Sequence, residues 1–227
     1  MYVYLIRAAF LLSLLYSLPG LAAGVEDDRV WLNINVNGPT ADPRWRWYAE
    51  LQPRWRDEAG TLDQTIARTA LYYSLTKQSS LWFGYAHIKS EPANRPDVDE
   101  NRLWQQYLYN FSPVDGMAVQ SRSRLEQRWI ENSQETGHKF RQMLRLSVAS
   151  GLHPSLAWVG FDEYFINLNN TDYGARKGFD QNRLFLGFNW AFDDRTKVEL
   201  GYLNQRVNTT QADSVFHALS TTLNINF

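Results

Sequence analysis

The sequence of 227 residues contains no cysteine, which excludes disulfides, thiolate metal ligands, cysteine nucleophiles and a lipid anchor attached through cysteine. It also has no surplus of charge, because 23 Lys and Arg residues face 24 Asp and Glu residues, for a net charge of -1. A chain without a basic surplus lacks the electrostatic signature of nucleic-acid binding, so we expect no nucleic acid as a partner. The four histidines show no metal-ligand spacing and no Gly-rich phosphate loop is present, so we expect no metal and no cofactor.

Long hydrophobic runs are missing as well. No apolar run after the N-terminus reaches the roughly 20 residues that a membrane-spanning helix requires. Residues 1–23 combine a basic Arg7, a short apolar stretch that ends before Pro19, and small residues ahead of a cleavage point after Ala23. This pattern predicts a secretory signal peptide, and a retained N-terminal anchor is the alternative that its short apolar stretch disfavours. The mature part, residues 24–227, is predicted to be one domain that crosses a membrane, if at all, with strands.

This remaining part consists of segments in which apolar and polar residues alternate with a period of two, as in strands with two unlike faces. The clearest segment is Arg44–Arg56, where Trp45 and Trp47 share one face and arginines occupy the other. Two further segments, Glu100–Phe111 and Leu156–Asn167, alternate imperfectly, which predicts a β-bulge in each. No helical period of 3.6 occurs outside the signal peptide. The predicted strands are Val30–Asn37, Arg44–Arg56, Thr65–Leu75, Leu81–Lys89, Glu100–Phe111, Val119–Trp129, Lys139–Ala149, Leu156–Asn167, Gln181–Trp190, Lys197–Gln205 and Val215–Phe227.

The connections between these runs alternate in length. Short turns are expected at Leu75–Leu81, Phe111–Met117, Ala149–Leu156 and Trp190–Lys197. More polar connections are expected at Arg56–Leu62, Lys89–Glu100, Ile130–His138, Asn167–Gln181 and Arg206–Val215. Short periplasmic turns opposite longer external loops are typical of outer-membrane barrels, and aromatic residues at the run ends are typical of their interfacial girdles. We therefore predict an all-β fold, an antiparallel up-and-down transmembrane β-barrel of the Gram-negative outer membrane.

The last run ends the chain on an aromatic residue. Apolar residues at every second position before a terminal Phe resemble the signal with which outer-membrane barrels engage their insertion machinery. We assign this insertion signal to Leu219, Leu223, Ile225 and Phe227. The expected partners are periplasmic chaperones and the barrel-assembly machinery during biogenesis, and outer-membrane lipids and lipopolysaccharide afterwards. The sequence assigns no oligomeric state.

The number of strands is ambiguous by one. Eleven runs are recognised, whereas bacterial single-chain barrels normally have an even number of strands. Placing Phe227 in the periplasm starts the first run outside the cell, so the parity points to the N-terminus. Either one strand is missed or two are merged, or the first run is not in the wall. Gly24–Asp28 is the candidate for a short extra strand or for a segment that passes through the lumen. The chain length fits about 10 to 12 strands, and we predict about 12.

The polar faces of the predicted strands are rich in Arg and Glu. If these faces point inward, the lumen receives Arg44, Arg46, Arg54, Arg68, Arg102, Arg122, Arg124, Arg128, Arg141, Arg145 and Arg183, together with Glu50, Glu100, Glu126, Glu163 and Glu199. A small barrel has little room, so we expect Arg forks on carboxylates to fill it as a structural network. The members assigned to this network are Arg102, Arg122, Arg124, Glu126, Arg128, Glu163 and Arg183. The alternative is a narrow, anion-attracting channel or a ligand cleft, because Arg outnumbers Glu on this face.

Candidate catalytic residues are sparse. His153 and Ser155 have the His-x-Ser spacing of outer-membrane lipases, but they fall in a predicted periplasmic turn, away from outer-leaflet substrates. Asp97, Asp99 and Glu100 supply acids near the predicted outer rim, where His87 is a distant candidate to join them. We assign no catalytic residues. An enzyme that acts on lipid or lipopolysaccharide at the extracellular rim is the competing functional class.

Several short motifs resemble a known family. They are Glu100–Gln106 (ENRLWQQ), Arg122–Trp129 (RSRLEQRW), Asp162–Phe165 (DEYF), Phe179–Leu184 (FDQNRL) and Leu200–Tyr202 (LGY). Their order and spacing resemble the outer-membrane proteins grouped as domain of unknown function 2490, over most of the mature chain. The resemblance implies a barrel with an Arg/Glu-rich interior and transfers no activity or catalytic residue.

Overall fold

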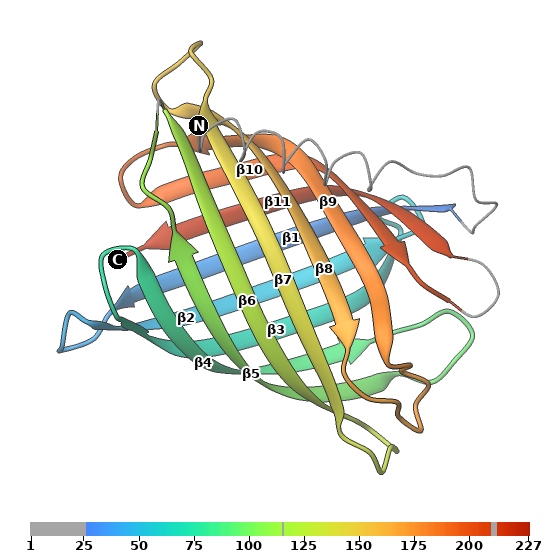
Figure 1. The fold of residues 1–227 in the computed structure, drawn as a ribbon. Coiled ribbons are helices and arrows are strands. Elements are labelled where there is room, and N and C mark those ends of the chain that lie inside the picture. The colour runs from blue at the N-terminus through green and yellow to red at the C-terminus, as the bar shows by residue number, and fades with distance from the viewer. Residues whose placement is uncertain (1–25, 115, 210–212) are drawn as a thin grey trace.

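The computed structural model describes residues 26–114, 116–209 and 213–227, and in this part of the chain eleven strands close into one barrel (Figure 1). The strands are β1 Glu26–Pro39, β2 Trp45–Arg56, β3 Thr61–Ser74, β4 Ser79–Ser90, β5 Val98–Asn110, β6 Met117–Ile130, β7 Gly137–Ala149, β8 Leu156–Asn167, β9 Gly178–Ala191, β10 Thr196–Val207 and β11 Ser214–Asn226. Each of the eleven predicted runs corresponds to one of these strands, to within a few residues at its ends. The predicted signal peptide, residues 1–23, lies outside the described residues.

Neighbours in the chain are neighbours in the wall, and all of these pairs are antiparallel. The barrel closes where β1 pairs with β11, and this pair is parallel, with Glu26 opposite Val215 and Asn37 opposite Asn226. Eleven strands lie within the predicted range of 10 to 12, one fewer than the preferred number. The odd number explains the parallel closure. With an odd number of up-and-down strands, the first and the last strand point in the same direction and therefore pair in parallel.

The N-terminal part of the wall corrects two predictions. β1 lies between β2 and β11, so the first run belongs to the wall and does not cross the lumen. Glu26–Asp28 begin β1 itself, in register with β11, so they do not form a separate strand. Gly24 lies outside the described residues. β1 begins beside the start of β11, at the end of the barrel opposite Phe227, as the parity of the strands requires.

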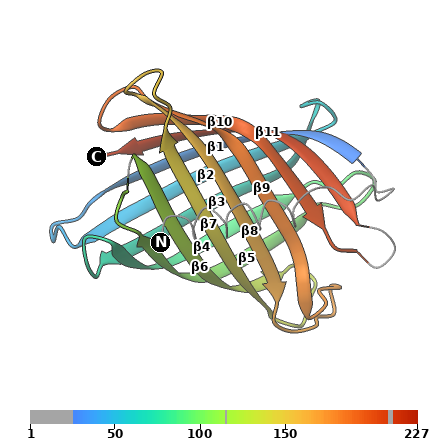
Figure 2. The ribbon, with the colours of Figure 1, turned by 45° about the horizontal axis from the view of Figure 1, so that its top comes forward.

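The two ends of the barrel carry different connections (Figures 1 and 2). One end, the turn end, holds the connections after β1, β3, β5, β7 and β9 together with Phe227; the other, the loop end, holds the connections after the even-numbered strands and the start of β1. The predicted loop between β2 and β3 is shorter than expected, because only residues 57–60 separate the two strands. Arg44 lies in the turn before β2, where it pairs with Asp42 at 2.9 Å, so its predicted place in the lumen is wrong.

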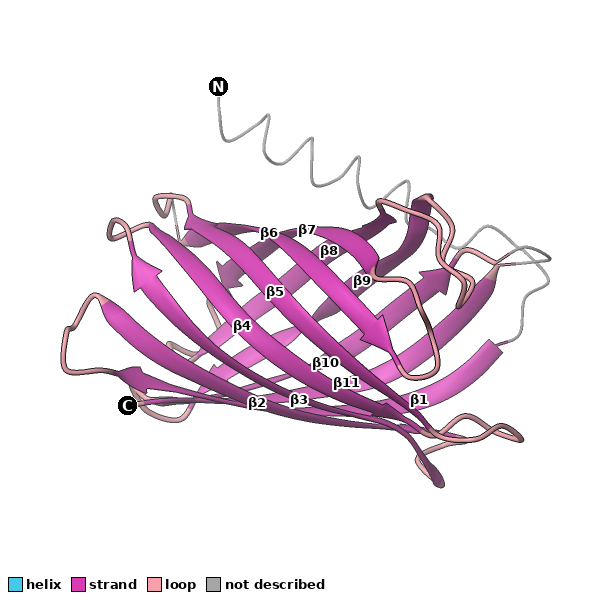
Figure 3. Cartoon of the chain, turned by 90° about the horizontal axis from the view of Figure 1, so that it is seen from below, coloured by secondary structure: helices cyan, strands magenta, loops and turns pink. Residues whose placement is uncertain are grey.

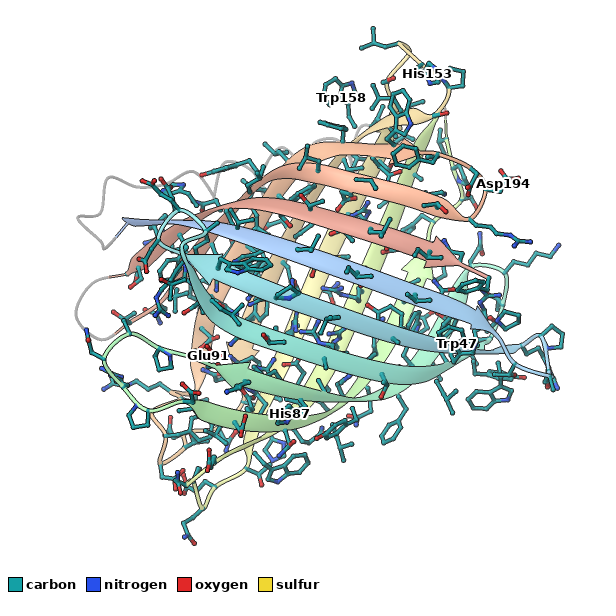
Figure 4. The ribbon with its side chains drawn as sticks, turned by 180° about the vertical axis from the view of Figure 1, so that it is seen from behind. Trp47, His87, Glu91, His153, Trp158 and Asp194 are labelled. Carbon is teal, nitrogen blue, oxygen red and sulfur yellow. The ribbon has the colours of Figure 1, made fainter. Side chains whose placement is uncertain are left out.

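Alternating side chains give the wall two unlike faces, as the period of two predicts. Large apolar side chains such as Leu51, Leu71 and Leu186 are exposed on the outside, while arginines of the same strands point inward. Figure 3 shows the tilted strands wrapping around one interior, and Figure 4 shows Trp47 and Trp158 projecting away from the wall. No helix in the described part of the chain is long and apolar enough to cross a membrane.

Polar residues on the outer face of β5 to β7 hydrogen-bond to one another. Gln105 and Gln127 exchange two bonds through their side-chain amides, at 3.0 and 3.1 Å. Gln142 accepts a bond from the hydroxyl of Ser123 at 2.6 Å and donates to the hydroxyl of Ser121 at 3.0 Å. These pairs satisfy groups that an apolar environment would otherwise leave without partners.

The register shifts at two places, both near the loop end. Asp63 is the additional residue where β3 pairs with β2, and Asp180 is the additional residue where β9 pairs with β8. The irregularity predicted for Leu156–Asn167 therefore exists, although the extra residue belongs to β9. The bulge predicted for Glu100–Phe111 is wrong, because β5 pairs with both neighbours in one continuous register. Its alternation is imperfect because an apolar side chain, Trp104, points inward.

Candidate functional site in the barrel lumen

Glu126 lies at the centre of the lumen, with a side chain that is 2% exposed. It comes from the middle of β6, whose inward face carries three arginines, Arg122, Arg124 and Arg128. Arg141 of β7 donates to its Oε1 at 2.6 Å, and Arg102 of β5 lies 3.5 Å from its Oε2. Arg124 is more distant, at 3.8 Å. A carboxylate this buried retains its charge because it is surrounded by guanidinium groups from three strands.

Glu100 anchors the network toward the loop end. Arg102 reaches it through Nε at 2.6 Å and Nη2 at 2.9 Å. Arg128 reaches the same carboxylate through Nε at 2.5 Å and Nη2 at 2.9 Å. Two forks on one carboxylate use the planar geometry in which Arg binds a carboxylate most strongly.

Glu163 extends the network toward the turn end and across the lumen. It accepts bonds from Arg141 Nε at 2.9 Å and from Arg122 Nη2 at 2.7 Å, so β6 is joined to β8 over the intervening strand. Arg145 of β7 pairs with Glu199 of β10, a strand three positions away in the wall. These bridges cross-link strands that backbone hydrogen bonds do not connect.

A separate ion pair lies on the opposite wall. Arg68 of β3 donates to Glu50 of β2, which also accepts a 2.6 Å bond from the hydroxyl of Tyr48. The structure thus brings together six of the seven predicted network residues around Glu100 and Arg141. The seventh, Arg183, forms no ion pair with a described residue. It lies instead over the rings of Trp31 and Phe165, at 4.9 and 4.8 Å.

Two apolar clusters also face the lumen, and the sequence reading did not identify them. One contains Trp31, Val159, Phe185, Leu203 and Ala218 and the other Ile66, Ala70, Ala86, Ile88 and Trp104. The alternation of the strands contains a signal for them, because residues two positions apart share a face. Phe185 follows the inward Arg183 by two positions, and Ile66 precedes the inward Arg68 by two. Their bulk narrows the space left for the charged residues.

Two polar cavities, of about 320 and 230 Å³, lie in the space that remains. The larger lies toward the turn end, beside Asn35, Asn224 and Glu199, and the smaller lies toward the loop end, beside Arg128 and Asp180. Four residues line both cavities, and all four are arginines: Arg54, Arg68, Arg141 and Arg183. They come from β2, β3, β7 and β9, so this layer of four arginines is built from widely separated parts of the wall.

The cavity walls are strongly positive. Their cationic side chains are Arg29, Arg54, Arg68, Arg102, Arg122, Arg124, Arg128, Lys139, Arg141, Arg145 and Arg183. Their carboxylates are Glu50, Asp63, Glu126, Glu163, Asp180 and Glu199. The excess of cations favours negative solutes over positive ones.

The bulges contribute part of this lining. Asp63 pairs with Arg29 and with Arg56, each at 3.0 Å, and Asp180 pairs with Lys139 at 2.7 Å. Neither aspartate belongs to a run predicted by strict alternation, because the extra residue of a bulge breaks the period. The period-two pattern therefore did not predict these ion pairs at the loop end.

The candidate catalytic residues lie elsewhere, and they do not form a triad. His153 lies in the turn after β7, where its Nδ1 accepts the backbone N–H of Ser155 at 3.1 Å and its ring stacks on Trp190. His87 lies on the outer face (Figure 4), 3.5 Å from Asp99 and 3.2 Å from the amide oxygen of Asn101. Among the described residues, no Ser or Thr hydroxyl bonds to a His ring, and no group of His, Asp and Glu is placed to hold a metal ion.

The proposed insertion signal lies on β11 and at the chain end. Leu219 and Phe227 are exposed on the outer face, in phase with Leu223 and Ile225. Phe227 stacks against Trp47 with ring centroids 6.3 Å apart, and its backbone N–H donates to Asn37 at 2.9 Å. The last residue is thereby tied to the closing strand pair.

The chain is therefore a closed β-barrel whose interior is crossed by a buried Arg/Glu ion-pair network. Residues 28–215 match the model of the family described as protein of unknown function (DUF2490), and the chain belongs to this family. A protein of Methylorubrum extorquens described as uncharacterized is 33% identical over 209 residues, which cover 91% of this chain and 90% of that protein. The family membership expected from the short motifs is confirmed, and these motifs supply Glu100, Arg122, Glu126 and Glu163 to the network.

Proposed function

We propose that this protein is an integral outer-membrane β-barrel that provides a narrow, anion-favouring polar path, held open and in shape by its internal ion-pair network. The observation that carries the proposal is the reversal of polarity across the wall. Exposed leucines and aromatic rings cover the outside, whereas charged residues are buried inside. A soluble barrel would place its apolar side chains inside and its charges in water, so this arrangement favours a lipid environment.

The pore part of the proposal rests on the two cavities. Both are lined mainly by polar side chains, and they share the layer of four arginines. A flexible guanidinium layer between two polar cavities permits a small solute to pass when side chains move. A purely structural barrel is the competing outcome, because ion pairs that fill a small lumen also stabilise the wall without any conduction.

The same proposal covers location and biogenesis. The outer surface would contact outer-membrane lipids and lipopolysaccharide, with the turn end in the periplasm and the loop end outside the cell. Leu219, Leu223, Ile225 and Phe227 would engage the barrel-assembly machinery after delivery by periplasmic chaperones. No described observation favours the enzyme alternative, because no Ser or Thr hydroxyl bonds to a His ring among the described residues.

Membrane location is tested by expressing the full chain in a Gram-negative host and separating inner and outer membranes. We expect the protein in the outer-membrane fraction, with an electrophoretic mobility that changes on boiling, as folded barrels show. Recovery in the soluble periplasm would contradict the proposal.

Conduction is tested separately, with purified protein in planar bilayers. We expect small, anion-selective single-channel currents, and we expect Arg68→Gln or Arg141→Gln to alter the selectivity because each removes one charge from the central layer. Arg195→Gln, in the exposed turn after β9, is the matched control. If wild-type protein that the mobility test shows to be folded gives no current in the bilayer, conduction is refuted and a structural role is supported.

A further inference from the structure

Two arginines of the central layer, Arg54 and Arg183, lack a carboxylate partner among the described residues. Arg54 is 7% exposed, and its guanidinium donates only to the amide oxygens of Gln64 and Gln52, at 2.9 and 2.7 Å. Arg183 donates no side-chain hydrogen bond to any described residue, and no described carboxylate lies within 4 Å of either group. By contrast, Arg141 in the same layer is paired with two glutamates.

Both guanidinium groups lie against the same ring. The Arg54 guanidinium carbon is 3.9 Å from the centroid of Trp31, and that of Arg183 is 4.9 Å from it. Arg183 also lies 4.8 Å from the ring of Phe165. Stacking fixes the planes of the two groups and leaves their edges, which carry the N–H donors, free to bind an acceptor. Among the described residues, the Arg54 edge meets only neutral amide oxygens, and the Arg183 edge meets no acceptor.

The unpaired donors confirm that acceptors are scarce at this position. The Nε atoms of Arg54 and Arg183 and the indole Nε1 of Trp31 are all buried without a hydrogen-bond partner among the described residues. Buried charges are normally paired, because removing them from water is costly unless an opposite charge compensates. Two like charges beside one ring add repulsion to that cost. A negative group rich in acceptors would compensate both charges and accept from these donors.

We propose that Arg54 and Arg183, positioned by Trp31, bind a small oxyanion, either a free one or a phosphate or carboxylate group of a small solute. Guanidinium forks match the paired oxygens of these groups. Both arginines line both cavities, so a solute that enters from either end meets the site. Cavities of about 320 and 230 Å³ admit a small molecule and exclude a polymer. The inference deepens the proposed function, on which it rests for access of solute to the lumen.

The site is tested by isothermal titration of inorganic phosphate and of acetate into the folded full-length barrel in detergent, at constant ionic strength. We expect saturable binding of phosphate, at one site per chain. Arg183→Gln and Arg54→Gln should each weaken it about tenfold or more, since a hydrogen bond to a charged group contributes roughly the free energy of a tenfold change. Arg183→Lys should retain more affinity than Arg183→Gln, because it keeps the charge.

Arg195→Gln removes the same charge from an exposed turn and should leave binding unchanged. Heat-modifiable mobility of every variant establishes that it is folded. Absence of saturable phosphate and acetate binding to the folded wild type would overturn the site, as would equal affinity in wild type and Arg183→Gln.

The titration needs neither a bilayer nor a current, so the two proposals fail separately. Saturable binding by a protein that gives silent bilayers would refute the pore and support the site. Anion-selective currents from a protein whose phosphate affinity is unchanged in Arg183→Gln would support the pore and refute the site.

Discussion

Asn35 and Asn224 lie side by side across the parallel closure of the barrel, and the Nδ2 of Asn35 donates to the Oδ1 of Asn224 at 3.0 Å. The pair is one step of a ladder on the lumen face of β1 and β11. Asn33 donates to Thr222 at 3.2 Å on one side of it, and Asn37 donates to Asn226 at 2.6 Å on the other. A parallel pair is slightly less stable per residue than an antiparallel one, so these side-chain bonds reinforce the closure.

The closure can be tested with an engineered disulfide, because the natural chain contains no cysteine. We expect the double variant Asn35→Cys, Asn224→Cys to form an intramolecular disulfide in the folded barrel. Paired residues on neighbouring strands lie about 4.7–4.9 Å apart, within the range that a disulfide spans. Migration on non-reducing gels and mass spectrometry measure the cross-link. Asn35→Cys with Ser220→Cys is the mismatched control, because Ser220 lies opposite Trp31, four residues out of register with Asn35. More cross-linking in this control than in the matched pair would contradict the register.

Removal of Arg141 tests the ion-pair network. Arg141→Gln should lower the free energy of unfolding by about 3–5 kcal/mol, because it leaves two buried carboxylates undercompensated. Unfolding in urea, in detergent or lipid, measures the change. The double variant Arg141→Gln, Glu126→Gln should cost less than the sum of the two single variants, because it removes the opposing charge as well. Additive losses would mean that the two side chains do not interact.

Much of the fold follows from the sequence because the wall separates two unlike environments. Each residue on a strand faces either the outside or the lumen, so alternation identified every strand and assigned Arg122, Glu126 and Glu163 to one interior. The parallel closure was not predictable in this way, because pairing of β1 with β11 joins the two ends of the chain and no local pattern records it. Arg44 was misplaced because a local bond to Asp42 holds it in a turn, and alternation contains no information about turn capping.

The site was predictable in composition but only partly in geometry. The arginines were identified as lumen residues by phase. An arginine pairs with a carboxylate only if the two side chains, on different strands, come close in the folded barrel. Alternation along one strand therefore does not predict that Arg141 has two carboxylate partners and Arg183 none among the described residues. Asp63 and Asp180 were missed because a bulge shifts the phase of alternation.

Gly84 provides a test of packing inside the lumen. A Cβ at this position would lie 2.4 Å from the ring of Trp104 and 2.5 Å from the carbonyl oxygen of Thr69, closer than real contacts allow. Gly84→Ala should therefore cost about 1–3 kcal/mol of unfolding free energy through overpacking. Urea unfolding measures this cost, and the background Trp104→Leu should reduce it if the ring is the obstacle. An unaffected midpoint in Gly84→Ala would contradict the placement of Trp104.

The loops after β6 and β8, residues 131–136 and 168–177, are joined at the loop end through Asp172. It accepts bonds from the hydroxyl of Ser133 at 2.5 Å and the backbone N–H of Gln134 at 2.7 Å, and these bonds hold the pKa of its carboxyl below the ordinary value of 3.8. A lowered pKa stabilises the contact above pH 3.8, and the contact is lost as the pH falls through the lower folded-state value. At neutral pH, Asp172→Ala should speed proteolysis of residues 168–177, read by mass spectrometry of the fragments. Equal cleavage rates in wild type and variant would show that the contact does not restrain the loops.

The last strand provides a test of which face meets lipid. Leu223 lies on the outward face of β11 and Asn224 on the lumen face, so adjacent positions should respond differently to substitution. Leu223→Arg should cost about 2–4 kcal/mol near the bilayer midplane, whereas Asn224→Ser should cost less because it keeps a polar group toward the lumen. Refolding equilibria in lipid vesicles measure both. Equal costs at positions 223 and 224 would contradict the assignment of these residues to opposite faces.

The terminal residue provides a test of the insertion signal. Deletion of Phe227 should lower the amount of heat-modifiable protein in the outer membrane, because it removes the terminal aromatic of the insertion signal and its contact with Trp47. Normal assembly without Phe227 would contradict the insertion signal.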